Sequence, residues 1–222
     1  MKLYKYMQKE HSESFFDTGK IRIGTLFDFR KTDVHNSVIG DENEGFQEKV
    51  MQTSGSFKFE EADTDQSSFL SNFFVRKPGS VGELTGVLEG NWSLVHRKSE
   101  PDYYVYCTST SFNPRVMIED FKYNSCIEIV KADLFINELF KAMKKHAKTG
   151  VYGNVSYSRK QLDFRDELKF PSVMIKDSKY YYQQEHRIAW LPKINSTNSI
   201  EPIFIQVPDA RKFCKLKKLS GV

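Results

Sequence analysis

The chain has 222 residues and a mass of 25.9 kDa, and 39% of its residues are hydrophobic and 28% charged. This length suffices for one substantial core or two small ones, and an aromatic content of 14% excludes a disordered chain, because disordered segments are poor in core-filling aromatic residues. The formal net charge of +4 favours anionic partners but is weaker than that of a dedicated nucleic-acid-binding domain.

Cellular location is indicated by what the sequence lacks. The N-terminal residues contain no apolar run of signal-peptide length, and no stretch of about 18 apolar residues occurs anywhere. The three cysteines, Cys107, Cys126 and Cys214, have no repeated short spacing, so they fit neither a disulfide framework nor a zinc site. The sequence therefore predicts a cytoplasmic protein with reduced thiols and no membrane contact.

The first part of the chain is predicted to combine short strands with one helix. A strand is expected over 3–6, a helix over 10–17 that ends at Gly19, and a second strand over 20–25, where apolar and polar residues alternate. Residues 30–45 are polar and end in a run of glycine, asparagine and acidic residues, which predicts a loop. A loop of this length is often functional.

The next segment has weaker signals. Strands are predicted over 46–50 and 56–59, as a hairpin around Gly55, and the acidic residues 60–65 are expected to form a surface connection. Residues 69–95 contain short apolar runs broken by glycines and a Pro-Gly pair. These breaks suggest strands or turns without defining their register.

The second half contains the clearest helix. Aromatic and β-branched residues predict a strand over 103–110, a short helix is expected to begin at Asn113, and another strand is expected over 125–130. A helix is then predicted from 133 to 148, with lysines late in the helix and Gly150 after it. Its apolar residues near one side are Leu134, Leu139, Met143 and Ala147.

The last part of the chain is predicted to be mostly extended. Extended segments are expected over 151–157 and 172–175, and two further strands over 186–191 and 202–207. With no internal repeat or linker, residues 1–222 are predicted to form a single mixed α+β domain with more strand than helix. A short basic tail at about 209–222 is expected to fray.

Several common functional motifs are absent. The chain has no Walker phosphate loop, no GxGxxG dinucleotide fingerprint and no Gly-x-Ser-x-Gly nucleophile elbow. Its five histidines are widely spread, and none forms the i, i+4 pair that places two ligands on one helix face. The sequence therefore predicts no metal site.

Three short segments carry the functional signal. In order and residue type, Lys20–Gly24, Tyr106–Ser111 and Tyr182–Arg187 resemble the Arg, Ser-Thr-Ser and Gln-x-Glu elements of arginine-containing mono-ADP-ribosyltransferases. In that family the arginine holds the NAD phosphates and the Ser-Thr-Ser strand supports the nicotinamide pocket. The glutamate binds the ribose hydroxyl beside the glycosidic bond that breaks.

The resemblance implies both NAD-binding and catalytic residues. The NAD-binding set is Arg22, Ser109, Thr110 and Ser111, with Arg187 as a further NAD-binding candidate, and the catalytic set is Glu185 with Gln183. Arg30 or Arg187 could replace Arg22 in the phosphate role. Cleavage of the bond to nicotinamide builds positive charge on the ribose, which a fixed carboxylate stabilises best where water is excluded. If residues 183–187 are extended, residues 183, 185 and 187 point the same way. Gln183 can then orient an acceptor, while Arg187 meets a phosphate or pairs internally.

A second resemblance covers more of the chain. It rests on Leu3–Tyr6, Ile21–Leu26 with Phe29 and Arg30, Gly40–Gly45, Tyr106–Ser109 and Lys179–Arg187, which look like segments of a broad family of proteins of bacteria and their phages. That family has no agreed activity. Its layout also resembles the split sheet of ADP-ribosyltransferase folds, in one branch of which a histidine often occupies the first strand, near the place of Lys5 here.

These resemblances imply an NAD-dependent ADP-ribosyltransferase-like protein. It would transfer ADP-ribose to a macromolecular acceptor, protein or nucleic acid, or hydrolyse NAD, in the setting of host-phage conflict. The alternative is a non-catalytic phage or defence-associated protein that binds a protein or a nucleic acid through aromatic and basic residues. A third possibility is a metal-dependent nuclease that uses Asp41, Glu44 and Glu185.

Overall fold

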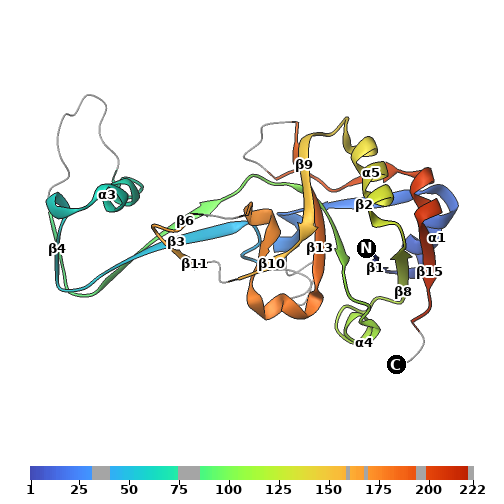
Figure 1. Ribbon diagram of the computed structural model, residues 1–222, viewed down its shortest axis with the longest axis horizontal. Coiled ribbons are helices and arrows are strands. Elements are labelled where there is room, and N and C mark those ends of the chain that lie inside the picture. The colour runs from blue at the N-terminus through green and yellow to red at the C-terminus, as the bar shows by residue number, and fades with distance from the viewer. Residues whose placement is uncertain (32–40, 75–85, 159–160, 168–169, 194–198, 220–222) are drawn as a thin grey trace. The chain divides into compact units, whose positions relative to one another are not determined.

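The computed structural model describes residues 1–31, 41–74, 86–158, 161–167, 170–193 and 199–219. The chain divides into two compact units (Figure 1). Unit 1 consists of residues 1–45, 101–158 and 172–222, and unit 2 consists of residues 46–100 and 159–171.

An antiparallel sheet of eight strands forms the framework of unit 1 in the described part of the chain. Six strands follow the order β14-β2-β7-β1-β8-β15, and β13 pairs with β7 and β9. The strands are β1 (Leu3–Met7), β2 (Lys20–Thr25), β7 (Tyr104–Ser109), β8 (Ser125–Ile129), β9 (Ala147–Asn154), β13 (Glu185–Pro192), β14 (Ile203–Gln206) and β15 (Cys214–Lys217). The predicted alternation in β2 is confirmed, since its isoleucines are buried while Lys20 and Arg22 are exposed.

The sheet splits along one edge of β7. One edge of β7 pairs with β13 along its whole length. On the other edge, β2 pairs with Tyr104 and Val105 at the start of β7, and β1 pairs with Ser109 at its end. Within the described residues, no strand pairs with residues 106–108 on this edge. The strands β1 and β2 therefore separate over the middle of β7.

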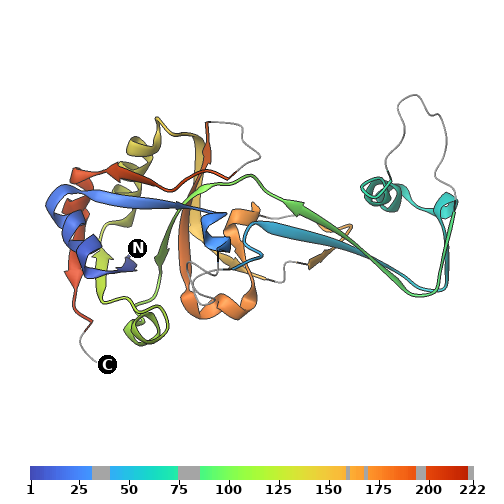
Figure 2. The ribbon, with the colours of Figure 1, turned by 180° about the vertical axis from the view of Figure 1, so that it is seen from behind.

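Two helices pack against the core of unit 1. The helix α1 (Lys9–Thr18) ends at Gly19, whose φ of +77° lets its N–H reach the carbonyl of Phe15 at 2.7 Å. The chain then enters β2 (Figure 2). The helix α5 (Ala132–Met143) buries one face, and its Phe135 ring lies 6.4 Å from the Phe15 ring of α1. Both rings belong to a core cluster that includes Leu3, Ile23, Ile129, Leu139, Ile188 and Trp190.

Shorter elements of unit 1 connect these strands. They are the helix α4 (Pro114–Glu119), the 3-10 helices η1 (Asp28–Arg30), η3 (Ser172–Met174), η4 (Ser178–Gln183) and η5 (Pro208–Phe213), and the parallel pair β10 (Ser156–Tyr157) and β12 (Ile175–Lys176). The predicted helix after Asn113 is confirmed as α4, with Pro114 in its first turn. The elements η3, β12 and η4 lead the chain into β13.

Unit 2 has its own small core. Its elements are β3 (Phe46–Thr53), β4 (Ser56–Lys58), η2 (Phe59–Glu61), α3 (Thr64–Leu70), β5 (Val87–Glu89), β6 (Trp92–Ser99) and β11 (Gln161–Asp163). The strand β3 pairs antiparallel with β6 and parallel with β11, and β4 pairs with β5. Met51, Phe69, Leu70 and Phe164 are buried together beside these strands.

The hairpin predicted around Gly55 is wrong in its pairing. The strand β3 pairs along its whole length with β6 and not with β4. The partner of β3 lies far later in the chain, so a local turn signal does not reveal it. The acidic segment expected to be a connection contains η2 and the start of α3, and the capping box of Asp63 and Gln66 explains the helix start. Of the loop predicted over 30–45, residues 32–40 lie outside the described residues.

Three predictions in unit 1 also change. The helix predicted to reach Lys148 ends at Met143, because Ala147 already begins β9, and Leu134 on its predicted apolar side is 44% exposed. Residues 172–174, expected to be extended, form η3. The segment predicted to be a basic tail forms η5 and β15, and β15 pairs with β8. In the first and third cases strand pairing outweighs the local preference, since β9 pairs with β13 and β15 pairs with β8.

The predicted fold class is confirmed at its coarser level. The protein is a strand-rich α+β fold with a large antiparallel sheet. Among the described residues, no helix combines the length and the apolar composition that crossing a membrane requires.

Candidate functional site

Glu185 occupies the first position of β13, directly after a tight turn. The residue before it, Gln184, has a positive φ of 46° and closes η4 with a hydrogen bond from its N–H to the carbonyl of Tyr181. The carbonyl of Gln184 in turn accepts the N–H of Thr110 at 2.8 Å, which holds the turn against the end of β7. Sheet pairing then places Glu185 opposite Ser109. The two segments identified from the sequence are therefore neighbours.

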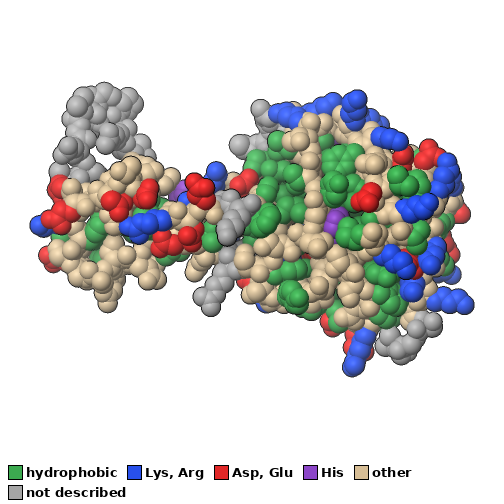
Figure 3. All heavy atoms as spheres, in the orientation of Figure 1, with side chains coloured by type: hydrophobic (Ala, Val, Ile, Leu, Met, Phe, Trp, Pro, Cys, Tyr) green, Lys and Arg blue, Asp and Glu red, His purple; other side chains and the backbone are tan. Residues whose placement is uncertain are grey.

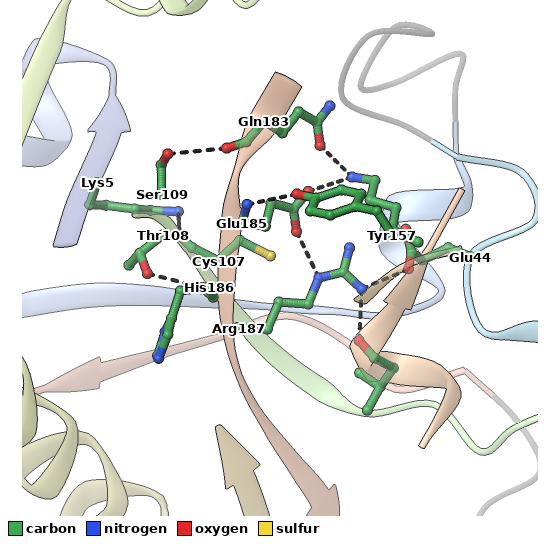
Figure 4. Close-up of polar contacts among 12 residues, drawn as sticks. Lys5, Glu44, Cys107, Thr108, Ser109, Tyr157, Gln183, Glu185, His186 and Arg187 are labelled. Carbon is green, nitrogen blue, oxygen red and sulfur yellow. Dashed lines mark hydrogen bonds and ion pairs between the residues drawn. The ribbon is translucent and has the colours of Figure 1, made fainter. Parts of the chain in front are cut away.

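The Glu185 carboxylate is bound by two cations (Figure 4). Its Oε1 accepts from the ammonium of Lys176 at 2.5 Å, and its Oε2 accepts from Nε of Arg187 at 2.7 Å. The Nη1 of Arg187 also donates to Glu44 at 2.7 Å and to the carbonyl of Val173 at 2.8 Å. All four charged side chains are buried. We call Glu44, Lys176, Glu185 and Arg187 the buried charge network.

The buried charge network determines the protonation of Glu185. Burial alone would raise the pKa of this carboxyl, but the charges and hydrogen bonds of Arg187 and Lys176 outweigh burial and lower the pKa to about 2. For Arg187, burial acts to lower the pKa, whereas Glu185 and Glu44 raise it well above its ordinary value. The carboxylate therefore stays ionised across the physiological pH range.

Two further side chains hold Glu185 and its cation in place. Lys176 donates a second hydrogen bond, of 2.6 Å, to Oε1 of Gln183. The backbone N–H of Glu185 donates to the hydroxyl of Tyr157 at 2.7 Å. Gln183 lies in η4 and not in a strand, so the predicted alternation of residues 183, 185 and 187 on one strand holds only for Glu185 and Arg187.

The hydroxyls of the Ser-Thr-Ser segment hold the backbone together. Ser109 donates to the carbonyls of Ser111 at 2.9 Å and Gln183 at 3.1 Å, and Thr110 donates to the carbonyl of Gln184 at 3.2 Å. Thr108, which precedes the segment, donates to the carbonyl of His186 at 2.9 Å. These bonds tie the end of β7 to the turn that precedes β13. The hydroxyls thus support the position of Glu185.

A small cavity lies beside Glu185. Its volume is about 100 Å³, and its lining combines polar groups of β7, β12, η4 and β13 with aromatic rings. The rings come from Tyr4, Tyr6, Phe29, Phe121 and Tyr123. The cavity is lined by three basic residues, Lys5, Lys176 and Arg187, and by two acidic residues, Glu44 and Glu185. Basic residues therefore exceed acidic residues by one. We call this space the aromatic cavity.

A second cavity adjoins the first. It has a volume of about 410 Å³ and shares Lys5, Tyr6 and Tyr123 with the aromatic cavity. Its other charged lining residues are Lys20 and Arg22 of β2, and His11 of α1 also faces it. Among the described residues, no acidic side chain lines it. We call this space the basic cavity.

Lys5 lies at the junction of the two cavities. Its ammonium donates to the carbonyl of Cys107 at 2.8 Å and lies 4.8 Å from the centre of the Tyr106 ring. Burial lowers the pKa of Lys5, and the nearby Cys107 and Glu185 oppose this effect. Cys107 lies in the stretch of β7 that neither β1 nor β2 covers. The cavities therefore meet at the split in the sheet.

The structure brings together most of the residues identified from the sequence. Ser109, Gln183, Glu185 and Arg187 line the aromatic cavity, whereas Thr110 and Ser111 do not. Arg22 lines the adjoining basic cavity, where its Nη2 pairs with Asp28 at 2.7 Å. Arg187 pairs internally, the second of the two roles that the sequence allowed.

Sequence reasoning missed several residues of the site. Lys176 follows a segment with no motif, and Tyr157 is one of 11 tyrosines, so neither gave a signal. Glu44, considered as a metal ligand or base together with Asp41, instead binds Arg187. Among the described residues, no group of three or more His, Cys, Asp or Glu side chains could hold a metal ion.

Comparisons of the chain with protein-family models, curated proteins and solved structures find no match. Function therefore has to be inferred from the two cavities and the residues that line them.

Proposed function

We propose that this protein binds NAD across the aromatic and basic cavities, and that it transfers ADP-ribose to an acceptor or hydrolyses NAD beside Glu185. The observation that carries the proposal is the adjacency of a buried carboxylate, in a small aromatic cavity, to a larger cavity whose charged lining is entirely basic. A dinucleotide requires such a pair of sites, because its ring and its diphosphate differ in chemistry. The two cavities meet at the split in the sheet, which supports a single ligand that spans both.

The basic cavity suits the diphosphate. The Arg22 side chain is 42% exposed, and guanidinium groups bind phosphate oxygens in a bidentate manner. Asp28 holds this guanidinium at 2.7 Å, which orients it. Lys5 and Lys20 add positive charge from two sides of the same cavity. In this proposal Arg22 is the principal phosphate-binding residue.

The aromatic cavity suits the nicotinamide ring and its ribose. Tyrosine and phenylalanine rings offer flat faces for a heteroaromatic ring. Glu185 is ionised, and a carboxylate has about four lone-pair positions, so contacts with Lys176 and Arg187 leave acceptor positions for a ribose hydroxyl. The low pKa of Glu185 fits a residue that stabilises positive charge and does not donate a proton.

One observation favours a second candidate, a protein that binds the nucleotide without cleaving it. The cations Lys176 and Arg187 contact both oxygens of Glu185 and reduce the negative potential that a cationic ribose would experience. The lining of the aromatic cavity has one cation in excess, which favours an anionic ligand over a developing cation. Catalysis would require NAD to displace at least one of these contacts.

Binding and chemistry are tested by separate measurements on the full-length chain. Calorimetric titration with NAD measures binding, and chromatography of free nicotinamide measures cleavage. We expect wild type to bind NAD and Arg22→Gln to bind it about tenfold more weakly, since a charged phosphate contact is lost. We expect Glu185→Gln to bind NAD and release nicotinamide only at the background rate.

Glu119→Gln serves as the control for the loss of one carboxylate, because Glu119 forms an exposed pair with Arg115. Circular dichroism confirms that each variant is folded, and Gln183→Ala provides a second probe of the aromatic cavity if Glu185→Gln is unstable. No NAD binding by folded wild type would refute the proposal. NAD binding by the wild type with nicotinamide release no faster than background would establish the non-catalytic candidate.

A further inference from the structure

A third hollow adjoins the basic cavity on its other side. This groove has a volume of about 530 Å³ and is lined by β14 and by residues at and just after the end of α5. Its basic side chains are Lys141, Lys144 and Lys145. Phe204 of β14 lines both the groove and the basic cavity. We call this hollow the lysine groove.

Phe204 is an exposed aromatic residue between two basic surfaces. Its side chain is 58% exposed, although it belongs to a regular strand. Pairing of β14 with β2 sets Phe204 opposite Arg22, and the ammonium of Lys20 lies 4.5 Å from the centre of the Phe204 ring. Within the described residues β14 is an edge strand of the sheet. One face of the ring is thus close to a cation while much of its area remains in solvent.

Positive charge continues along both hollows. The charged lining residues of the basic cavity and the lysine groove are Lys5, Lys20, Arg22, Lys141, Lys144 and Lys145, and no described acidic residue lines either hollow. Nearby acids pair with two of them, Asp28 with Arg22 and Glu138 with Lys141. Figure 3 shows Lys and Arg side chains gathered along the edge of unit 1 near α5. The two hollows therefore form a basic track, and Phe204 is the aromatic residue that lines both of them.

We propose that Phe204 and the lysine groove of this track bind single-stranded nucleic acid, which stacks a base on Phe204 and places its phosphates along the lysine groove, while the basic cavity holds the diphosphate of NAD. Single-stranded nucleic acid is recognised by a basic groove that follows the backbone and by aromatic side chains on which bases stack. The bases of a duplex are paired and cannot stack on a lone ring in a groove. An acidic peptide would use the lysines and leave Phe204 without a role.

The track leads to the candidate NAD site, so the bound strand is placed to be the acceptor of ADP-ribose, a statement that rests on the proposed function. In that transfer, a nucleophilic oxygen or nitrogen of the strand forms a bond to C1′ of the nicotinamide ribose. The bond from C1′ to the nicotinamide nitrogen breaks with its electron pair on nicotinamide, and the proton of the acceptor passes to water. No oxidant or reductant is required.

Fluorescence anisotropy with a labelled oligothymidylate of about 20 nucleotides tests the binding track without NAD. Measurements at about 50 and 200 mM salt separate the electrostatic part of binding from stacking. We expect Lys144→Gln/Lys145→Gln to bind about tenfold more weakly and to show a shallower salt dependence. The control Lys58→Gln/Lys98→Gln removes the same charge from exposed positions in unit 2 and should bind like wild type.

The aromatic contact has its own pair of variants. We expect Phe204→Ala to weaken binding about tenfold at both salt concentrations, and Phe204→Trp to restore it, since stacking on a ring tolerates the change. The exposed Phe170→Ala in unit 2 is the matched control. Equal binding by Phe204→Ala and wild type would overturn the proposal, as would equal affinity for polyglutamate or for duplex DNA.

Separate measurements distinguish a failure of the nucleic-acid proposal from a failure of the NAD proposal. Calorimetry with NAD alone measures the candidate NAD site, whereas anisotropy measures the track. Oligonucleotide binding that depends on Phe204, together with transfer of label from NAD to the oligonucleotide, supports both. A folded protein that binds NAD and does not bind the oligonucleotide overturns the track and leaves the NAD site standing. Track binding without label transfer overturns the acceptor role alone.

Discussion

The ammonium of Lys5 donates a hydrogen bond of 2.8 Å to the backbone carbonyl of Cys107, where β1 and β2 separate along β7. In a continuous sheet, a neighbouring strand would supply the donor for a carbonyl on this edge. A side chain of β1 supplies it here, and the same ammonium lines both the aromatic and the basic cavities. Lys5 thus satisfies a backbone group at the split and adds charge to the candidate site.

Lys5→Met tests the second of these contributions. The change keeps the length of the side chain but removes the cation that the two cavities share. We expect about tenfold weaker NAD binding, since one charged interaction with the diphosphate is lost. Calorimetry measures the affinity. Lys5→Arg retains the charge and should keep most of the binding, so equal affinities of the Met and wild-type proteins would contradict the placement of the ligand.

The stability contributed by Glu185 is expected to depend on pH. Its pKa in the folded protein is about 2, below the ordinary value of 4.5, so the ionised carboxylate stabilises the folded state at pH above 4.5. This stabilisation is lost as the pH falls from 4.5 toward 2. Chemical denaturation of wild type and Glu185→Gln should show a difference in the free energy of unfolding that narrows over this range. A constant difference would show that the Glu185 pKa is not lowered.

Arg187 should matter far more to stability than an arginine on the surface. Arg187→Met removes the guanidinium that Glu44 and Glu185 share; among the described residues Lys176 still pairs with Glu185, and removal of one member of a buried pair costs about 3–5 kcal/mol. Arg115 and Glu119 form an exposed pair on α4, so Arg115→Met should cost less than about 1 kcal/mol. Urea denaturation of both variants measures the two values. Similar decreases in the free energy of unfolding for Arg187→Met and Arg115→Met would refute the buried charge network.

Gly19 and Gly55 offer a test of tertiary constraint at nearly equal backbone angles. Their φ values are +77° and +76°, so alanine is strained at both by about 1–2 kcal/mol. A Cβ at Gly19 would lie 2.6 Å from the backbone of Pro208, whereas a Cβ at Gly55 meets nothing within 4 Å. We expect Gly19→Ala to lower the free energy of unfolding by at least about 2 kcal/mol more than Gly55→Ala. Thermal and urea denaturation measure both variants. An equal decrease in the free energy of unfolding for Gly19→Ala and Gly55→Ala would contradict this expectation.

The three cysteines should react slowly in the folded protein. Burial is the main cause that raises the pKa of Cys107 to about 11 and those of Cys126 and Cys214 to about 12. Little thiolate then exists at pH 8, and the thiolate is the reactive form. A disulfide reagent should label the native protein slowly and all three thiols rapidly in denaturant. Rapid labelling of one native thiol would identify a cysteine whose surroundings differ from those described.

Local sequence signals predicted the strands of unit 1 well. The alternation in 20–25 and the aromatic, β-branched run in 103–110 correspond to β2 and β7, and Gly19 ends α1 as expected. The local sequence signals gave wrong predictions where a strand distant in the sequence determined the structure. Residues 147–148 joined β9 because β13 lay beside them, and residues 214–217 formed β15 because β8 offered an edge.

The sequence also indicated part of the candidate site. Ser109, Gln183, Glu185 and Arg187 share a cavity, although they were identified only from two short segments. The strand proposed for 183–187 begins two residues later, because η4 and the positive φ of Gln184 intervene. Thr110 and Ser111 lie outside the cavity since β7 ends at Ser109.

By itself, the sequence determined the strand-rich α+β class, most strands of unit 1 and the two polar segments that contain Ser109 and Glu185. These features depend on local periodicity and on short-range backbone preferences, which a few neighbouring residues encode. Only the tertiary structure decided the partners of Glu185, the split over Cys107 and the track through Phe204. Residues far apart in the chain form each of these, and local propensity carries no information about which distant side chains meet.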